Sequence, residues 1–543
     1  MNSANLLLRC LENEGVEFVF GVPGEENLDV MDALLDSEIR FITCRHEQGA
    51  AFMADVYGRL SGRAGVCLAT LGPGATNLMT GVADANMDHA PLVAITGQAG
   101  IGRQHKESHQ HIDIVSAFRP ITKWNTLISS PPVIPEVVRK AFKLAQAEKP
   151  GATHLDFPED VADLPGEGEP MPVESPAQAE PSPTALRIAA GLIREAQAPI
   201  VLAGAGVARN RAVTALREFA ERVNIPVANT FMGKGVLPQT SEQSLLTVGL
   251  QARDYVMAGF DRADVVIAVG YDIVEYAPVN WNPTGDKKII HIDATPAEVD
   301  AAYSPTVEVV GDLGTALREL AGMVPPKETC VVCHLRPVIL EELDGAEEAD
   351  AFPLKPQRVI AEMRRALADD DLLISDVGAH KLWIARMFPT MQPNTCIISN
   401  GLAAMGIALP GAIAAKLYQP HRKVIAACGD GGFLMNVQEL ETAVRLRTPF
   451  VTLIFNDGGY GVIAWKQMLK FGRPAYVDFG NPDFVKLAES FGCAGYRVER
   501  AGDLAPMLKE ALALDRPAVI DCPVDYSENL KLTEKLGHIT VSV

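Results

Sequence analysis

The chain has 543 residues, of which 48% are hydrophobic and 21% are charged, and its formal net charge at pH 7 is −20. This length and composition predict a water-soluble globular protein of about three or four domains. The negative charge argues against nucleic acid or an anionic membrane surface as a partner, and no uninterrupted apolar run approaches the ~18 residues that span a bilayer.

The first ten residues and the cysteines both indicate a cytoplasmic protein. Residues 1–10 are largely apolar with no basic region, which predicts a first helix and not an export signal. There are nine cysteines, scattered through apolar segments, and we expect them to be reduced thiols. Cys330-Val-Val-Cys333-His334 matches a haem-attachment pattern, but that chemistry needs export, and a zinc site would need a second cysteine pair. We therefore expect neither haem nor zinc there.

Two changes of composition divide the chain. Residues 164–184 are rich in Pro, Glu and Gly, and a second break at 323–356 contains Pro-Pro and a strongly acidic run. These predicted linkers leave three blocks, 1–165, 185–325 and 355–530. Each block alternates short aliphatic runs with helix-length amphipathic segments, which is the pattern of parallel sheets covered by helices. We predict an α/β protein of three doubly wound parallel-sheet domains.

Ten short aliphatic runs are predicted as buried strands. They are residues 18–22, 40–44, 65–69 and 91–95 in the first block, 199–203, 265–269 and 288–292 in the second, and 372–375, 423–428 and 450–455 in the third. The first and third blocks share a layout, because each has a Gly-rich turn followed by a long helix.

Polar motifs follow several of these strands. Glu47 lies where a strand gives way to an Ala-rich helix predicted over residues 50–60. Taken alone, it is a carboxylate that the helix dipole stabilises by roughly a few tenths of a kcal/mol. Gly72-Pro-Gly-Ala-Thr-Asn77 opens another helix but lacks the Lys-Ser/Thr of a P-loop, so its simplest interpretation is a capped turn. Gly204-Ala-Gly206 begins like a dinucleotide fingerprint without the third glycine, which is weak support for a nicotinamide.

The third block carries the most informative segment. Gly429-Asp430-Gly431-Gly432 follows one predicted strand, and Asn456-Asp457-Gly458-Gly459-Tyr460 follows the next. Glycines at a strand end let backbone N–H groups approach an anion such as a phosphate. Two carboxylates at neighbouring strand ends suit a magnesium ion that also binds phosphate oxygens. Gly-Asp-Gly-Gly alone would also fit a tight turn, but the paired spacing favours the metal site.

This segment resembles the cofactor signature of thiamine-diphosphate enzymes, in which Gly-Asp-Gly is followed at this spacing by Asn-Asn or a variant. Asp457 replaces the commoner Asn and is an equally good oxygen ligand. The resemblance implies thiamine diphosphate and Mg²⁺ as cofactors, a pyrimidine-binding first domain and a diphosphate-binding third domain. Asp430, Asp457 and the Gly459 carbonyl would bind the metal. The implied cofactor contacts are Pro23, Glu47, Gly72, Asn77, Gly378, Ala379, His380, Met405, Gly429, Asp430, Gly431, Gly432, Asp457, Gly459 and Tyr460.

The resemblance gives Glu47 and Met405 specific roles. In this family one glutamate hydrogen-bonds N1′ of the aminopyrimidine and favours the tautomer whose 4′ nitrogen removes the thiazolium C2 proton; Glu47 occupies the matching position. Met405 matches a bulky apolar residue that bends the two cofactor rings towards each other. On its own, Met405 would be interpreted as core filling and His380 as a solvent-facing histidine.

Within the family the chain is most similar to acetolactate synthases, which join two pyruvates with loss of CO2. Residues 381–386, 398–401 and 438–446 match that branch, as does the segment around Gln110, which would approach the substrate from the partner subunit. The resemblance implies Glu47 and Gln110 as catalytic residues and a 2-oxo acid as the substrate. It also implies a homodimer or homotetramer with active sites at the subunit interface.

The second block bears on flavin. Residues 270–276, followed by Asn280-Trp-Asn282, are similar to the catabolic, flavin-independent synthases. The biosynthetic, FAD-containing branch carries Gly-Ala-Arg-Phe-Asp-Asp there, and its arginine can meet the phosphates of a flavin. Tyr271 offers no positive charge for them, so we expect no FAD.

One departure leaves the substrate open. Gly24 is followed by Glu25-Glu26, where catabolic synthases carry Ala-Lys near the bound substrate. A carboxylate facing pyruvate would weaken binding unless one of the two is protonated, Glu26 turns away, or Arg103 or Lys106 compensates. Three alternatives therefore stay open: another thiamine-dependent decarboxylase or carboligase, a flavin-dependent pyruvate oxidase, and a non-catalytic protein that binds the cofactor.

Overall fold

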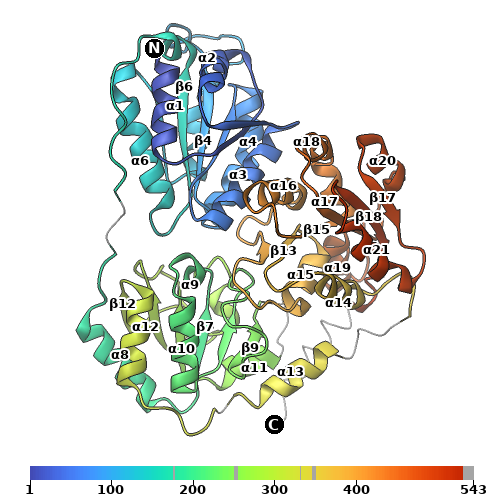
Figure 1. The fold of residues 1–543 in the computed structure, drawn as a ribbon. Coiled ribbons are helices and arrows are strands. Elements are labelled where there is room, and N and C mark those ends of the chain that lie inside the picture. The colour runs from blue at the N-terminus through green and yellow to red at the C-terminus, as the bar shows by residue number, and fades with distance from the viewer. Residues whose placement is uncertain (175–177, 250–254, 331, 345–349, 530–543) are drawn as a thin grey trace.

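Three α/β domains follow one another along the chain (Figure 1). The computed structural model describes residues 1–543 except 175–177, 250–254, 331, 345–349 and 530–543. Each domain has a six-stranded sheet in which every pair of neighbouring strands is parallel, with helices packed on the sheet. This confirms the predicted fold class, and each of the ten predicted strands is present.

The N-terminal domain has the strand order β2-β1-β3-β4-β6-β5. Its strands are β1 (Phe18–Gly21), β2 (Arg40–Thr43), β3 (Gly65–Ala69), β4 (Leu92–Gln98), β5 (Trp124–Leu127) and β6 (Ala152–Pro158). Its helices are α1 (Ser3–Asn13), α2 (Leu28–Ala33), α3 (Glu47–Ser61), α4 (Pro73–Met87), α5 (Ile114–Phe118), α6 (Ile134–Gln146) and α7 (Glu159–Asp163).

The C-terminal domain repeats this order as β14-β13-β15-β16-β18-β17. Its strands are β13 (Leu372–Ser375), β14 (Cys396–Ile398), β15 (Val424–Gly429), β16 (Val451–Asn456), β17 (Ala494–Arg497) and β18 (Ala518–Pro523). Its helices are α14 (Pro356–Ala366), α15 (Ala379–Met387), α16 (Ala408–Tyr418), α17 (Asp430–Met435), α18 (Glu439–Leu446), α19 (Gly461–Phe471), α20 (Phe484–Phe491) and α21 (Leu504–Ala511).

The central domain differs, because its order β9-β8-β7-β10-β11-β12 is that of dinucleotide-binding sheets. Its strands are β7 (Pro199–Ala203), β8 (Val227–Asn229), β9 (Ser244–Thr247), β10 (Val265–Val269), β11 (Lys288–Asp293) and β12 (Val307–Val310). Its helices are α8 (Pro183–Glu195), α9 (Gly206–Arg209), α10 (Val213–Val223), α11 (Tyr255–Arg262), α12 (Leu313–Met323) and α13 (Leu335–Asp344).

The first and last domains share one hydrophobic core. Helix α3 of the N-terminal domain packs on α16 of the C-terminal domain, and Ala51, Val56, Ala412 and Ile413 belong to the same buried cluster. Both helices are rich in alanine, so their backbones approach closely. A Cβ atom added at Gly411 would lie 2.8 Å from the Val56 side chain, which leaves room only for glycine there.

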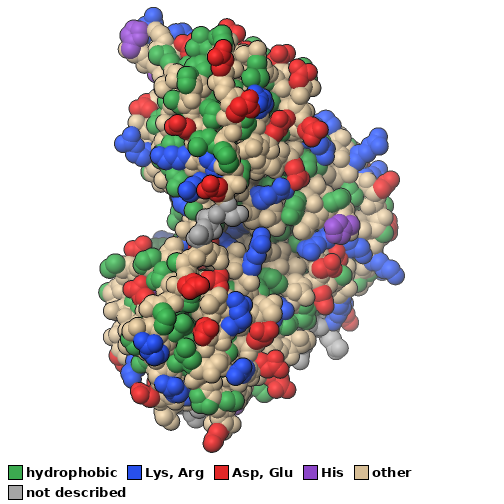
Figure 2. Space-filling view, turned by 60° about the vertical axis from the view of Figure 1, so that its left-hand side comes forward, with side chains coloured by type: hydrophobic (Ala, Val, Ile, Leu, Met, Phe, Trp, Pro, Cys, Tyr) green, Lys and Arg blue, Asp and Glu red, His purple; other side chains and the backbone are tan. Residues whose placement is uncertain are grey.

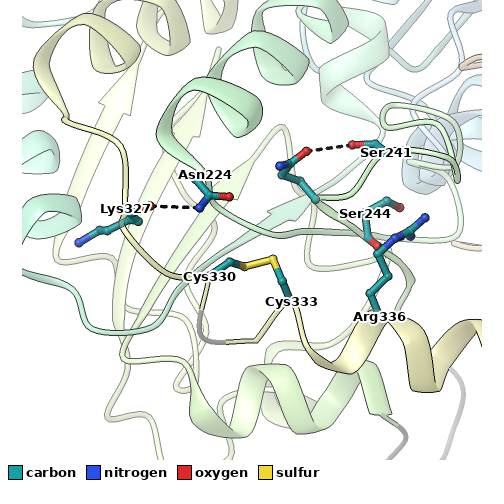
Figure 3. Close-up of a disulfide and its surroundings, with 8 residues drawn as sticks. Asn224, Ser241, Ser244, Lys327, Cys330, Cys333 and Arg336 are labelled. Atoms are coloured by element: carbon teal, nitrogen blue, oxygen red, sulfur yellow. Dashed lines mark hydrogen bonds between the residues drawn. A yellow bond between two sulfur atoms is a disulfide. The ribbon is translucent and has the colours of Figure 1, made fainter.

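Two expectations about the segment after the central sheet are wrong. The predicted linker 323–356 contains helix α13, which packs against α11 and β9 because its apolar residues Leu335 and Ile339 are buried in the central domain. Cys330 and Cys333 are not reduced thiols, since they form a disulfide just before α13 (Figure 3). Their Cα atoms lie only 5.3 Å apart, which is within bonding range. The seven other cysteines are free and buried.

The surface mixes charges of both signs. Figure 2 shows Lys and Arg interspersed with Asp and Glu over the visible face, so the net charge of −20 does not gather there in one acidic area. None of the helices in the described ranges is both long and apolar enough to cross a membrane.

Candidate active site

The predicted metal residues lie at the carboxyl edge of the C-terminal sheet. Strands β15 and β16 are direct neighbours, so Asp430 and Asp457, which follow them, meet at the same edge. Asp430 Oδ2 accepts hydrogen bonds from Gly458 N (2.8 Å) and Asn481 Nδ2 (2.7 Å). Burial and the negative charge of Asp430 raise the pKa of Asp457 to about 7. The site therefore holds two carboxylates whose repulsion a divalent cation would relieve.

The other predicted residues of this turn line the same edge. Tyr460 packs edge-on against Phe479, with ring centroids 4.9 Å apart, and its ring lies over Gly431. The residue before it, Gly459, forms an isolated bridge with Asp478. Gly429 and Gly432 flank the start of α17 on either side of Asp430. The structure thus brings together the turns after β15 and β16.

His380 lies at the same edge of the sheet, just after a third strand. It follows β13, the neighbour of β15, and its ring lies against Gly378 and Gly429 and stacks on Phe455. Burial lowers the pKa of His380 to about 3, so the imidazole is neutral. Its Nε2 is buried without a hydrogen-bond partner among the described residues. Such an atom is suited to a polar group of a ligand.

Met405 is held beside the same edge by its neighbour. Gly406 N donates to Asp376 Oδ1 (2.8 Å), and the Gly406 carbonyl accepts from Asn436 Nδ2 (2.9 Å). Burial raises the pKa of Asp376 to about 7, and its second oxygen has no partner within the described part of the chain. The β13–β15 crevice, where strand order reverses, is the usual ligand position in such sheets.

A second set lies at the corresponding edge of the N-terminal sheet. Glu47 is the first residue of α3, and Asn77 of α4 donates from Nδ2 to its Oε2 (2.9 Å). A Cβ atom at Gly72 would lie 2.6 Å from the Gln110 carbonyl, so the Gly72 turn and Gln110 are in contact. Pro23 is exposed beyond the end of β1. The predicted residues thus form two sets, one on each terminal domain.

Glu26, the departure noted in the sequence, turns inwards. It is 6% exposed, and its Oε2 accepts a hydrogen bond from the Thr70 hydroxyl (3.0 Å). Arg103 lies 3.8 Å from its other oxygen and pairs more closely with Glu159 (2.5 Å). Of the two cations considered for this role, Arg103 is the one that lies near Glu26, but it shares its charge with Glu159.

Sequence reasoning missed two polar residues of the C-terminal edge. Asn481 bridges Asp430 and the Asn456 side chain, and its own Oδ1 is buried without a partner in the described ranges. It lies in a loop with no periodic pattern, so no local signal marks it. Asp376 follows a predicted strand directly, and that position was a usable signal.

Neither a cluster of metal-binding side chains nor the cavity between the three domains coincides with these residues, within the part of the chain that the structure describes. No group of three or more His, Cys, Asp or Glu side chains in the described ranges is arranged to hold a metal. A cavity of about 360 Å³ lies instead where the three domains meet, and Arg59, His89, Arg209 and Ile398 help to line it. Any metal at Asp430 and Asp457 would need further ligands from backbone and cofactor oxygens.

Comparisons with known proteins decide the family. Residues 1–117, 186–320 and 376–522 match the N-terminal TPP-binding, central and C-terminal TPP-binding domains of the thiamine pyrophosphate enzymes. The chain belongs to the thiamine pyrophosphate enzyme family. Glu47, Asn77 and Gln110 fall in the first TPP-binding domain of this family, and His380, Met405, Asp430 and Asp457 fall in the second.

Several relatives within the thiamine pyrophosphate enzyme family match almost the whole chain. It is 38% identical to an acetolactate synthase of Bacillus subtilis over 97% of this chain and 94% of the relative. The identity is also 38% to a catabolic acetolactate synthase of Raoultella terrigena, over 98% of this chain and 97% of the relative. A probable acetolactate synthase large subunit of Methanocaldococcus jannaschii is 38% identical over 99% and 95%.

Proposed function

We propose that the protein is an acetolactate synthase, which decarboxylates pyruvate and joins the remaining two-carbon unit to a second pyruvate, giving 2-acetolactate and CO2. The observation that carries this choice is the 38% identity, along 97% to 99% of the chain, to proteins named as acetolactate synthases. Membership of the thiamine pyrophosphate family supplies the cofactor that this reaction needs.

The residues of the C-terminal edge suit a diphosphate with its metal. Asp430, Asp457 and the Gly459 carbonyl would hold Mg²⁺, and the raised pKa of Asp457 supports this because a cation would stabilise both carboxylates. The unpartnered His380 Nε2 would meet a diphosphate oxygen or its bridging solvent. Bound thiamine diphosphate supplies the electron sink for loss of CO2.

The residues at the edge of the N-terminal sheet would hold and transfer a proton. The Asn77 amide donates to Glu47 Oε2 and fixes the carboxylate plane, which leaves Oε1 to share a proton with a pyrimidine nitrogen. Gln110 would orient the substrate from its place against the Gly72 turn.

The central domain supports a flavin-independent enzyme. The turn after β7, where a dinucleotide phosphate would bind a sheet of this order, is contacted by the Glu275 side chain from the loop after β10. Both Glu275 oxygens accept from Ala205 N (3.1 Å each), and Oε2 also accepts from the Thr230 hydroxyl. A carboxylate of the chain itself thus takes the donors that a flavin's phosphate would need, so these residues do not fit FAD.

We propose a homodimer or homotetramer in which the Glu47 set of one subunit faces the Asp430 set of another. Helix α19, directly after Tyr460, supports this. Its Ile463, Leu469 and Phe471 are 45%, 52% and 65% exposed, an apolar surface beside the diphosphate edge. Exposed apolar surface of this kind is typical of a protein interface.

The test is an assay with pyruvate, run with and without thiamine diphosphate, Mg²⁺ and FAD. We expect 2-acetolactate and CO2 only with the first two and no effect of FAD. Glu47→Gln should lower the rate by about 10²–10⁴-fold, because a carboxamide cannot share the proton. The exposed Glu319→Gln in α12 is the control and should keep the parental rate. Turnover of another 2-oxo acid but not pyruvate would refute the proposal, as would full activity of Glu47→Gln.

A further inference from the structure

A buried cluster of four ionisable residues joins the N-terminal domain to the loop that carries Met405. Arg59 of α3 binds Asp55 (2.6 Å), Asp84 (3.1 Å) and Asp88 (2.9 Å). The three aspartate side chains are fully buried, and the Arg59 side chain is 9% exposed. Buried charges of this kind are costly unless they are paired and hydrogen-bonded, so the arrangement is strongly constrained.

Two of these aspartates also accept hydrogen bonds from the C-terminal domain. Asp84 Oδ1 accepts from the Ser399 hydroxyl (2.7 Å) and from Ala404 N (3.2 Å). Asp88 accepts from Asn400 N (3.0 Å) and from Gly401 N. Four contacts, at residues 399, 400, 401 and 404, therefore fix this loop from outside its own domain.

The same loop is fixed at both of its ends and by the central domain. Arg59 donates to the Ile398 carbonyl (3.3 Å) before it, and Gly406 N donates to Asp376 after it (2.8 Å). In the middle, Asn400 Nδ2 donates to the Glu275 carbonyl of the central domain (2.9 Å). Met405 lies between the Asp84 contact and the Gly406 contact, so little freedom is left to its backbone.

We propose that Asp84 and Asp88 are positioning residues for the cofactor. Their hydrogen bonds to the 399–404 loop hold Met405 in a fixed position in the active site. This rests on the proposed function, in which Met405 bends the two rings of thiamine diphosphate towards each other. A displacement of about 1 Å in such a group can cost ~10²-fold in rate. Asp55 belongs to the same ion cluster but, within the described part of the chain, bonds to Arg59 and not to the loop, so it provides a matched control.

The first measurement is amide hydrogen exchange in the cofactor-free protein. Asp84→Ala and Asp88→Ala should speed exchange in residues 399–406, because each removes acceptors for that loop. Asp55→Ala removes an equally buried carboxylate that bonds to Arg59 and Asp84 but not to the loop, so it should speed exchange in the loop much less than Asp84→Ala does. Ser399→Ala is a milder loop-side variant that serves if an aspartate variant fails to fold.

The second measurement is the rate at which bound thiamine diphosphate exchanges its C2 proton for deuterium, followed by proton NMR without pyruvate. Asp84→Ala should slow this exchange at least about tenfold at saturating cofactor. Asp84→Asn should restore much of it, since the amide oxygen can still accept from Ser399 and Ala404. Asp55→Ala should exchange like the parent.

Equal effects of Asp55→Ala and Asp84→Ala on both measurements would reduce the cluster to a purely structural role and overturn the inference. A parent that exchanges C2 rapidly but makes no acetolactate would refute the proposed reaction and leave the positioning role intact. A parent that binds the cofactor without faster C2 exchange would overturn both.

Discussion

The Glu275 carboxylate lies inside the central domain, and burial raises its pKa to about 7 although Arg209, Thr230 and the Ala205 N–H favour the charged form. The folded state therefore binds this proton more tightly than the unfolded chain, in which the pKa is near its usual 4.5. Ionisation of Glu275 costs stability as pH rises from about 4.5 to 7, by up to ~3 kcal/mol.

Glu275→Gln should remove this penalty, because the neutral amide keeps a similar shape and can accept from Ala205. Relative to the parent, we expect the melting temperature of the variant to rise as pH increases from 4.5 to 7.5, and then to stay level. Thermal unfolding over this pH range measures the difference. Asp156, whose pKa burial also raises to about 7, is a positive control at a site far from the turn, and Asp156→Asn should show the same kind of pH dependence. A constant offset between Glu275→Gln and the parent at every pH would contradict the assignment.

At the scale of elements, Cys330 and Cys333 differ from the other cysteines because they form a disulfide just before α13 (Figure 3). Arg336 in the first turn of α13 donates to the carbonyls of Ser244 (2.8 Å) and Gln239 (2.6 Å), which ties the helix to the edge strand β9. The pair therefore closes a small ring at the point where α13 is attached to the central sheet.

Thiol titration of the native protein should find no reactive thiol before reduction. The seven free cysteines are buried, and burial raises their pKa, for example to about 11 for Cys396. Brief treatment with a dithiol should release two thiols, and none in the Cys330→Ser, Cys333→Ser double variant. Two reactive thiols without any reductant would show that the pair is not oxidised in solution.

The strands that the sequence predicted share a strong local signal, and many of those it missed have a weaker one. Strand β18, with its buried Ala-Val-Ile run, and Asp376, directly after a predicted strand, carried a usable signal and were missed nonetheless. Aliphatic runs marked ten strands, but β5 and β17 are short, half-exposed edge strands without such a run. Strand β6 was missed although it is fully buried, because His154 and Asp156 interrupt it and are satisfied by Thr96 from β4. In the sequence, Asp84 and Asp88 look like ordinary acidic residues of a helix, because the residues that donate hydrogen bonds to them lie more than 300 positions away.

At the scale of the whole molecule, we expect the first and last domains to unfold as one cooperative unit and the central domain as another. The cluster shared by α3 and α16 contains no central-domain residue, whereas the central sheet has its own clusters around Phe219 and Phe260. Such units open with their own free energies.

Calorimetry should therefore resolve two unfolding transitions. Phe219→Ala, which leaves a cavity in the central domain, should cost about 3–5 kcal/mol and lower one transition. Gly411→Val, which forces α16 away from α3, should lower the other. If both variants shifted a single common transition, the three domains would unfold as one unit.

The close fit of Gly411 against Val56 also constrains how the protein is made. About 350 residues separate these partners, so at ~5–20 residues per second a ribosome needs roughly 20–70 s to supply the second helix after the first. During that interval the alanine-lined side of the nascent first domain has no cover, and it can find its permanent neighbour only when translation is nearly finished.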